Sequence, residues 1–168
     1  MRIVGLAGWS GSGKTTLLSG LIPELVARGL TVSTIKHAHH SFDIDQPGKD
    51  SWRHRAAGAS EVMVASARRW ALMRELHEEA EPTLDELVAR MRPVDLLLVE
   101  GFKRHPHPKV EVHRPALGKP LLYPDDPHIV AIAADQPLAA PLPLLPLGDP
   151  TAVARFILEE LEVAPWRN

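Results

Sequence analysis

The chain has 168 residues, of which 45% are hydrophobic and 24% charged, and it contains no cysteine. This length and composition indicate one globular domain, residues 1–168, and exclude a disordered or membrane-spanning chain. A formal net charge of −2 argues against nucleic acid as the main partner, and the lack of cysteine excludes disulfides and thiolate metal sites, so we expect a cytoplasmic protein.

The first elements follow the order strand, glycine-rich turn, helix, strand. Arg2 to Ala7 is an unbroken apolar run, which predicts a buried strand. Apolar residues then recur at helical spacing from Lys14 to Ala27, and Arg28-Gly29 supplies a cationic last turn and a terminal glycine. Pro23 should remove one backbone hydrogen bond from this predicted helix. Thr31 to Lys36 is predicted to be the second strand.

The middle of the chain predicts a loop, a short helix and a hairpin. His37 to Gly48 holds too many polar and turn-forming residues for regular structure. Lys49 to Ala57 can form a short helix that stops at Gly58. Two strands, Glu61 to Ala65 and Arg69 to Met73, follow with a tight connection, so we expect a β-hairpin insertion.

The second half alternates predicted strands and helices. Thr83-Leu84-Asp85-Glu86 is a capping-box pattern that opens a helix to about Met91. Four prolines between Pro137 and Pro146 indicate an extended connection, and Asp149-Pro150 indicates the start of a last helix. Further strands are predicted at Val94 to Val99, Val110 to Arg114 and Ile129 to Ala133. The alternation predicts an α/β protein with a mostly parallel, helix-covered sheet.

The turn after the first strand matches the phosphate-binding pattern G-x-x-x-x-G-K-[ST], at Gly8, Gly13, Lys14 and Thr15. Together with the alternating elements, this motif predicts a three-layer P-loop NTPase fold. Glycines let backbone N–H groups approach phosphate oxygens, and the helix that follows points its positive end at them. We expect Lys14 to bridge the β and γ phosphates in catalysis and the Thr15 hydroxyl to ligate Mg²⁺. The predicted nucleotide contacts are Gly8, Ser10, Gly11, Ser12, Gly13, Lys14, Thr15 and Thr16.

A second acidic motif is predicted where the apolar run Leu96 to Val99 ends on a carboxylate. Glu100 is the candidate catalytic residue and Mg²⁺ ligand, because an acidic residue at this strand end reaches the metal in P-loop proteins. Asp95 begins the same strand, away from the expected phosphate site, and is better explained as a cap or surface charge.

The sequence does not decide the function of two groups of polar residues. His37, His39 and His40 with Asp43 and Asp45 could bind a transition metal, or could contact phosphates, Mg²⁺ waters or an anionic ligand. A basic run follows Glu100 and fits either anion capture or a solvated loop. Its members are Lys103, Arg104, His105, His107 and Lys109.

Four runs together resemble the MobB family of molybdopterin-guanine dinucleotide biosynthesis adaptors. They read GWSGSGKTTLL, IKHAHHSFDIDQPGKDSWRHRAAGA, VASARRWALM and DLLLVEGFK. The likeness runs from residue 3 to about 104 and resumes at residues 129–135. It implies a GTP-binding, weakly hydrolytic homodimer that uses Mg²⁺ and assists the MobA nucleotidyltransferase in attaching GMP to molybdopterin.

The resemblance also bears on single residues. It supports phosphate contacts at Gly11, Gly13, Lys14, Thr15 and Thr16, and it places Glu100 at the acidic motif. His37 and Asp45 fall in the signature loop of the family and are predicted nucleotide contacts. Asparagine occurs only at position 168, so the guanine-reading N-K-x-D motif is absent. Guanine preference therefore rests on the resemblance, with Asp135 as the predicted base contact.

Three other functions use the same residues. A P-loop small-molecule kinase would pass the γ-phosphoryl group to an acceptor near His37 to Asp45. A metal-delivery GTPase would carry a transition ion on the histidine loop. A binding module would hold the nucleotide without hydrolysing it.

Overall fold

The computed structural model describes residues 1–38 and 42–161, and it divides the chain into two compact units. The sheet unit combines Met1–His37 with Met91–Asn168, and the hairpin unit is Ala38–Arg90. The sheet unit is thus built from two separate stretches of sequence, and the hairpin unit is inserted between them.

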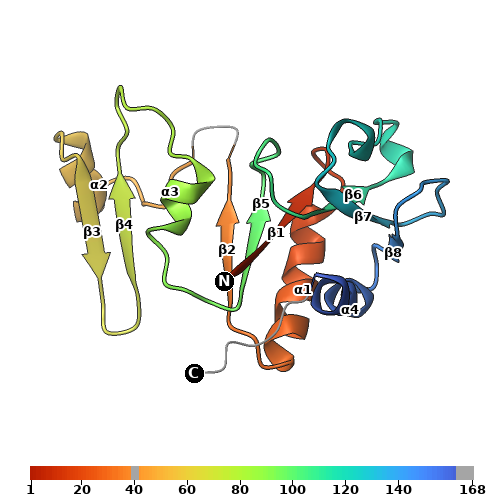
Figure 1. Cartoon of the computed structure of the whole chain (residues 1–168). Coiled ribbons are helices and arrows are strands. Elements are labelled where there is room, and N and C mark those ends of the chain that lie inside the picture. The colour runs from red at the N-terminus through yellow and green to blue at the C-terminus, as the bar shows by residue number, and fades with distance from the viewer. Residues whose placement is uncertain (39–41, 162–168) are drawn as a thin grey trace. The chain divides into compact units, whose positions relative to one another are not determined.

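The sheet unit contains a six-stranded sheet with the order β2-β5-β1-β6-β7-β8 (Figure 1). All five pairings between neighbouring strands are parallel. The strands are β1 (Arg2–Ala7), β2 (Val32–Lys36), β5 (Leu96–Glu100), β6 (Lys109–His113), β7 (Ile129–Ala134) and β8 (Leu144–Pro146). The predicted α/β class with a mostly parallel sheet is therefore confirmed. The carboxyl ends of β1 and β5 meet at one edge, where ligands bind in open α/β sheets.

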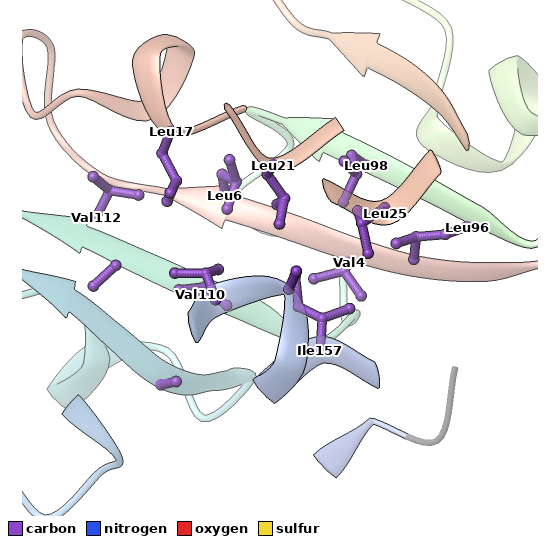
Figure 2. Close-up of a cluster of buried hydrophobic side chains, with 14 of the residues drawn as sticks. Val4, Leu6, Leu17, Leu21, Leu25, Leu96, Leu98, Val110, Val112 and Ile157 are labelled. Carbon is purple, nitrogen blue, oxygen red and sulfur yellow. The ribbon is translucent and has the colours of Figure 1, made fainter. Parts of the chain in front are cut away.

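Two helices, α1 (Lys14–Ala27) and α4 (Pro150–Glu160), pack together against one face of this sheet. Leu17, Leu21 and Leu25 recur every four residues along α1 and are buried against strand residues such as Val4 and Leu98 (Figure 2). Full burial of each leucine contributes about 2 kcal/mol. The predicted bounds of α1 are confirmed, although Pro23 lies inside it.

Polar side chains dominate the opposite face of β6. Val110 and Val112 point to the helices, whereas Glu111 alternates with them and points to the other side, where it is also buried. The Glu111 carboxylate accepts hydrogen bonds from the backbone N–H groups of Leu122 (2.8 Å) and Tyr123 (3.0 Å). In the sheet unit, the outer layer on this face thus includes a loop with two 3₁₀ turns, Pro115–Leu117 and Tyr123–Asp125.

The hairpin unit contains the predicted β-hairpin. The strands β3 (Glu61–Ala65) and β4 (Trp70–Arg74) pair antiparallel, after the short helix α2 (Asp50–Ala56). The helix α3 (Leu84–Val88) begins with a complete capping box, in which Thr83 and Glu86 bond to each other's backbone N–H. The sequence predicted that this helix extends to about Met91. It is shorter in the structure, where its C-cap is Ala89.

The proline-rich segment, predicted as an extended connection, ends in a short strand at the sheet edge. Its last residues form β8, a three-residue strand that pairs with β7 and is the edge strand of the sheet among the described residues. Proline is tolerated at sheet edges because no further strand needs its missing N–H. In the described part of the chain, no helix is both long and apolar enough to cross a membrane.

Candidate functional site

The loop between β1 and α1 has a backbone that only glycine can adopt at two positions. Gly8 has φ 147°, and a Cβ there would lie 2.4 Å from the carbonyl oxygen of Val112 and 2.8 Å from Ser12 Oγ. Gly13 caps α1 in the left-handed region, with φ 102°. The glycine pattern of the sequence therefore reflects a tightly wound loop that ends at the helix N-terminus, the arrangement that binds anions.

Lys14 lies over this loop. Its ammonium donates hydrogen bonds to the carbonyl oxygens of Gly8 (3.0 Å) and Trp9 (2.9 Å). Burial lowers the pKa of Lys14, which the nearby Glu100 carboxylate partly opposes. Lys14 begins α1, so its charge lies at the N-terminus of that helix, and its contact with phosphates remains a prediction.

Two oxygen-bearing side chains, Thr15 and Glu100, lie together next to Lys14. The Thr15 hydroxyl donates to Glu100 Oε1 at 3.5 Å, and Lys36 Nζ lies 3.9 Å from Glu100 Oε2. The strand register explains why Glu100 lies near Lys36. Glu100 at the end of β5 is paired with Leu6 of β1 on one side and with Lys36 of β2 on the other. A hydroxyl and a carboxylate are hard oxygen donors, so this pair fits Mg²⁺.

The other predicted loop residues differ in exposure. Ser10 and Thr16 are exposed, whereas Ser12 is buried. Among the described residues, no hydrogen-bond partner is found for Ser12 Oγ. The adjacent Ser12 carbonyl is bonded, because it accepts from the guanidinium of Arg114.

His37 lies beside the acidic motif. Its backbone N–H donates to the carbonyl oxygen of Glu100 at 2.8 Å, and its ring stacks on Phe102 with centroids 4.7 Å apart. A Cβ on Gly101, where φ is 102°, would lie 2.5 Å from His37 Cβ. The two turns after β2 and β5 are therefore packed closely. His39 and His40 lie outside the described residues.

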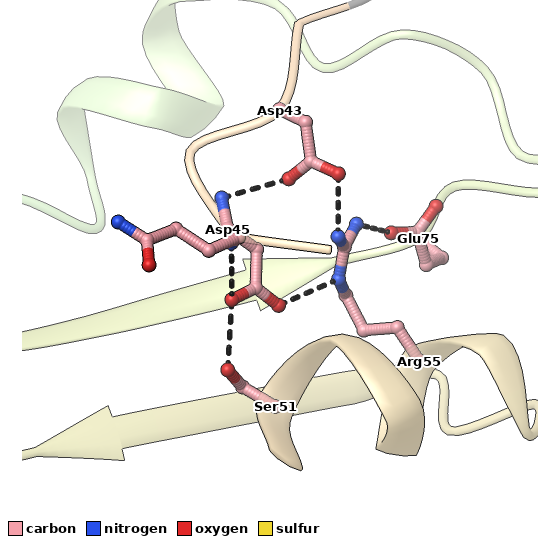
Figure 3. A network of polar contacts seen from close by, with 6 residues as sticks. Asp43, Asp45, Ser51, Arg55 and Glu75 are labelled. Atoms are coloured by element: carbon pink, nitrogen blue, oxygen red, sulfur yellow. Dashed lines mark hydrogen bonds and ion pairs between the residues drawn. The ribbon is translucent and has the colours of Figure 1, made fainter. Parts of the chain in front are cut away.

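Asp45 has a structural role inside the hairpin unit. Its carboxylate accepts from the Ser51 hydroxyl (2.8 Å) and pairs with Arg55 Nε (3.4 Å). Arg55 also bonds to Asp43 and Glu75, each at 2.7 Å (Figure 3). This network gives the Asp43 and Asp45 carboxylates partners within the protein, and the role of Asp45 as a nucleotide contact remains a prediction.

A transition-metal site finds no support in the residues the structure describes. No group of three or more histidine, cysteine, aspartate or glutamate side chains among residues 1–38 and 42–161 could hold a metal ion. The hypothesis of a metal-delivery GTPase therefore rests only on the sequence pattern.

The residues of the basic run after Glu100 lie in different environments. Lys103 Nζ lies 5.3 Å from the ring centroid of Trp9, so this cation is beside the loop. Lys109 is instead buried, where its ammonium donates to the carbonyl oxygen of His105 (2.8 Å) and pairs with Asp126 (3.1 Å). Neither a solvated loop nor anion capture describes the whole run, because part of it forms the interior.

Arg114 is the residue of this site that the sequence did not indicate. Its Nε donates to the carbonyl oxygen of Ser12 at 3.1 Å, and its Nη1 lies 3.3 Å from Asp135 Oδ2. Arg114 follows β6 and Asp135 follows β7, so both lie at the carboxyl ends of their strands. The sequence predicted both strands, but not that β6 lies beside β1.

Known proteins of one family match most of this chain. The model of the MobB family, described as molybdopterin guanine dinucleotide synthesis protein B, matches residues 3–135. The molybdopterin-guanine dinucleotide biosynthesis adapter protein of Escherichia coli is 45% identical over 95% of this chain and 93% of its own. The adapter protein of the same name from Haemophilus influenzae is 46% identical over 92% of this chain and 86% of its own.

A solved structure extends the likeness to the fold. The crystal structure of a MobB protein homolog from Bacillus stearothermophilus aligns with a TM-score of 0.70 at 25% identity. The alignment covers 98% of this chain and 100% of that one. The matched residues include the loop with Lys14 and Thr15, the strand end with Glu100, and Asp135. The chain belongs to the MobB family.

Proposed function

We propose that this chain binds GTP with Mg²⁺ and acts as an adapter in molybdopterin-guanine dinucleotide biosynthesis. The observation that carries the proposal is the meeting of Lys14, Thr15 and Glu100 at the carboxyl ends of β1 and β5. A lysine and backbone N–H groups hold the β and γ phosphates in such loops, and the hydroxyl and carboxylate hold the metal. The relatives named as adapter proteins support the pathway.

Hydrolysis by the chain alone is proposed to be slow. Bound Mg²⁺ supplies positive charge to the oxygens of the transferred phosphoryl group. Lys14 would exchange its contacts with the Gly8 and Trp9 carbonyls for the phosphates, and Glu100 would be engaged with the metal rather than with the attacking water. A multiple-turnover assay with GTP and Mg²⁺ tests this, and fast hydrolysis without any partner would contradict it.

Calorimetric titration with GTP, GDP and ATP in Mg²⁺ tests the nucleotide itself. The Lys14→Ala variant should lose binding, because it removes the phosphate-facing charge. Arg28→Ala is the matched control, since Arg28 is a cation at the other end of α1 and pairs with Glu24, four residues before it, at the surface. Guanine-selective binding that Lys14→Ala abolishes supports the proposal. Equal or tighter binding of ATP would favour the kinase hypothesis.

The partners proposed for this adapter are the MobA nucleotidyltransferase and molybdopterin. The test is whether the purified chain increases the yield of molybdopterin-guanine dinucleotide by MobA. Lys14→Ala should lower this effect if nucleotide binding is part of the assistance. If Lys14→Ala stimulates MobA as strongly as the unaltered chain, the assistance to the partner does not depend on the nucleotide site.

A homodimer is proposed as well, and the hairpin unit offers an apolar surface for it. Met63 and Leu72 are paired across the hairpin and share a face with Trp70, because alternate strand residues point the same way. These side chains are 62%, 45% and 65% exposed, respectively. Contiguous apolar surface of this kind marks interaction sites. Trp70→Glu should convert a dimer to a monomer in sedimentation equilibrium, whereas Arg68→Glu at the nearby turn should not.

We also propose that residues 1–168 act as one nucleotide-binding domain with an inserted hairpin unit. A single unfolding transition, followed both by circular dichroism and by calorimetry, would support this organisation. Two separate transitions would assign the two units independent stability.

A further inference from the structure

Four of the six lysines in the sequence lie around the phosphate-binding loop of the sheet unit. They are Lys14, Lys36, Lys103 and Lys119. The proposed nucleotide site uses Lys14 directly, and it involves Lys36 through the 3.9 Å contact with Glu100. Lys103 and Lys119 have no assigned role there, although both are exposed. These two cations therefore need a different explanation.

The ring of Trp9 brings these two cations together. Lys103 Nζ lies 5.3 Å from the centroid of the ring, and Lys119 Nζ lies 5.8 Å from it. The indole Nε1–H donates to the carbonyl oxygen of Pro120 at 2.8 Å, which fixes the ring against the loop that carries Lys119. Lys103 lies in the loop after β5 and Lys119 in the loop after β6. Two loops that follow different strands thus place an ammonium group at the same aromatic side chain.

Within the described part of the chain, no carboxylate neutralises either ammonium. Among residues 1–38 and 42–161, the lysines that pair with a carboxylate are Lys36 and Lys109. The face of an indole ring attracts a cation but carries no net negative charge. Positive charge therefore remains at this surface, although the whole chain has a formal net charge of −2. A negatively charged partner is the complement of such a surface.

We propose that Trp9, Lys103 and Lys119 form a docking surface for an acidic segment of the protein partner. This inference rests on the proposed function, in which the chain is an adapter. Tryptophan is enriched among the residues that dominate binding energy at protein interfaces, and charges around such a residue select the partner and speed its association. Lysine carries its charge on a flexible stem. It therefore suits the carboxylates of a protein surface, whereas arginine is preferred where an anion is held in one fixed geometry.

The docking surface adjoins the nucleotide site through the backbone of Trp9. The carbonyl oxygen of Trp9 accepts a hydrogen bond from Lys14 Nζ at 2.9 Å, while the ring of the same residue lies beside Lys103 and Lys119. An acidic segment bound to the ring is therefore next to the lysine proposed to hold the phosphates. This position brings the partner protein beside the bound nucleotide.

The test measures binding of the purified chain to MobA by calorimetry, with GTP and Mg²⁺ at saturation. The double variant with Lys103→Gln and Lys119→Gln should weaken the complex by about tenfold at low ionic strength. Raising the salt from about 50 to about 300 mM should weaken the unaltered complex and reduce its difference from the double variant. The affinity of the double variant for GTP should stay within about threefold, since both lysines are exposed. Lys49→Gln is the matched control, because Lys49 is an exposed lysine of the hairpin unit.

A second variant tests the ring. Trp9→Ala should weaken the complex with MobA by about 30-fold, because it removes the aromatic anchor. The backbone carbonyl that accepts from Lys14 is still present in this variant. Trp9→Phe retains an aromatic face for the lysines but loses the hydrogen bond to Pro120, so its effect should be smaller.

The outcomes separate this inference from the proposed function. If the double variant binds MobA as tightly as the unaltered chain, with the same salt dependence, the inference is wrong. Loss of inorganic phosphate binding in that same variant would then identify a free anion as the ligand. If the double variant weakens GTP as much as it weakens MobA, the two lysines belong to the nucleotide site and the inference is also wrong. If the unaltered chain does not bind MobA, the proposed partner itself fails.

Discussion

Replacing Asp95 by alanine is expected to destabilise the fold by about 3 kcal/mol and to leave GTP affinity unchanged. The Asp95 carboxylate accepts hydrogen bonds from the backbone N–H of Thr31 (2.7 Å) and from the Thr31 hydroxyl (2.6 Å). Only 7% of Asp95 is exposed, so water replaces these bonds poorly in the variant. Bonds to a charged group contribute about 1.5–3 kcal/mol each, and the lower figure for each of the two bonds gives about 3 kcal/mol.

Urea denaturation followed by circular dichroism measures this loss. With a slope of about 2 kcal/mol per molar urea, 3 kcal/mol corresponds to a fall of about 1.5 M in the midpoint. Thr31→Val removes the hydroxyl but keeps the N–H bond, so its loss should be smaller than that of Asp95→Ala. Glu100→Gln is a control with the reverse expectation. It should weaken Mg²⁺-dependent GTP binding and change the free energy of unfolding by less than about 1 kcal/mol.

The comparison of the two carboxylates can refute the reasoning. If Asp95→Ala weakens GTP binding as strongly as Glu100→Gln and leaves the urea midpoint unchanged, the structural role of Asp95 is wrong. In that case the functional end of β5 has been misassigned.

Three further predictions follow from close contacts and burial. Gly20→Ala should destabilise the fold by about 1 kcal/mol in urea, because a Cβ 2.6 Å from the Pro150 ring outweighs the roughly 1 kcal/mol gain in helix propensity. Gly8→Ala should abolish GTP binding in calorimetry, since the Val112 carbonyl occupies the space of its Cβ. Burial lowers the pKa of His107 to about 4, so stability in urea should fall by about 2 kcal/mol from pH 6.5 to 4.

The sign of the pH effect follows from proton uptake. Between pH 6.5 and 4 the unfolded chain protonates His107 while the folded chain keeps it neutral, so acid favours unfolding. The contribution is fully present above pH 6.5. His107→Gln should remove this part of the slope, and an unchanged slope would assign the acid sensitivity to other groups. A more stable Gly20→Ala, or a Gly8→Ala variant that binds GTP normally, would contradict the packing described for α1 and its loop.

Local patterns predicted much of the fold. The bounds of α1, the hairpin of β3 and β4 and the capping box of α3 depend on periodicity or on residues a few positions apart, so the sequence carries them directly. The extent of α3 and the edge strand β8 depend on what packs or pairs with them. Tertiary context of this kind is not visible in a local pattern.

The same division applies to the site. Gly8, Lys14 and Thr15 belong to one short sequence motif, so their proximity was predictable, and Glu100 was indicated by the apolar strand before it. Arg114 reaches Ser12 across 102 positions, which required knowing that β6 lies beside β1. The interior position of Lys109 was equally hidden, because a lysine in a basic run resembles a surface residue until its strand register is known.

The position of β5 between β1 and β2 has a consequence for how the chain is made. β1 pairs with β5 and β6, both of which follow residue 95, so a nascent chain that ends before that point has β1 and β2 without their neighbours. The hairpin of β3 and β4 needs only residues 61–74 and forms earlier. During synthesis the backbone N–H and C=O groups of the apolar strand β1 therefore stay unpaired until β5 and β6 have been made. Unpaired apolar strands of this kind are sites of aggregation and chaperone binding in nascent chains.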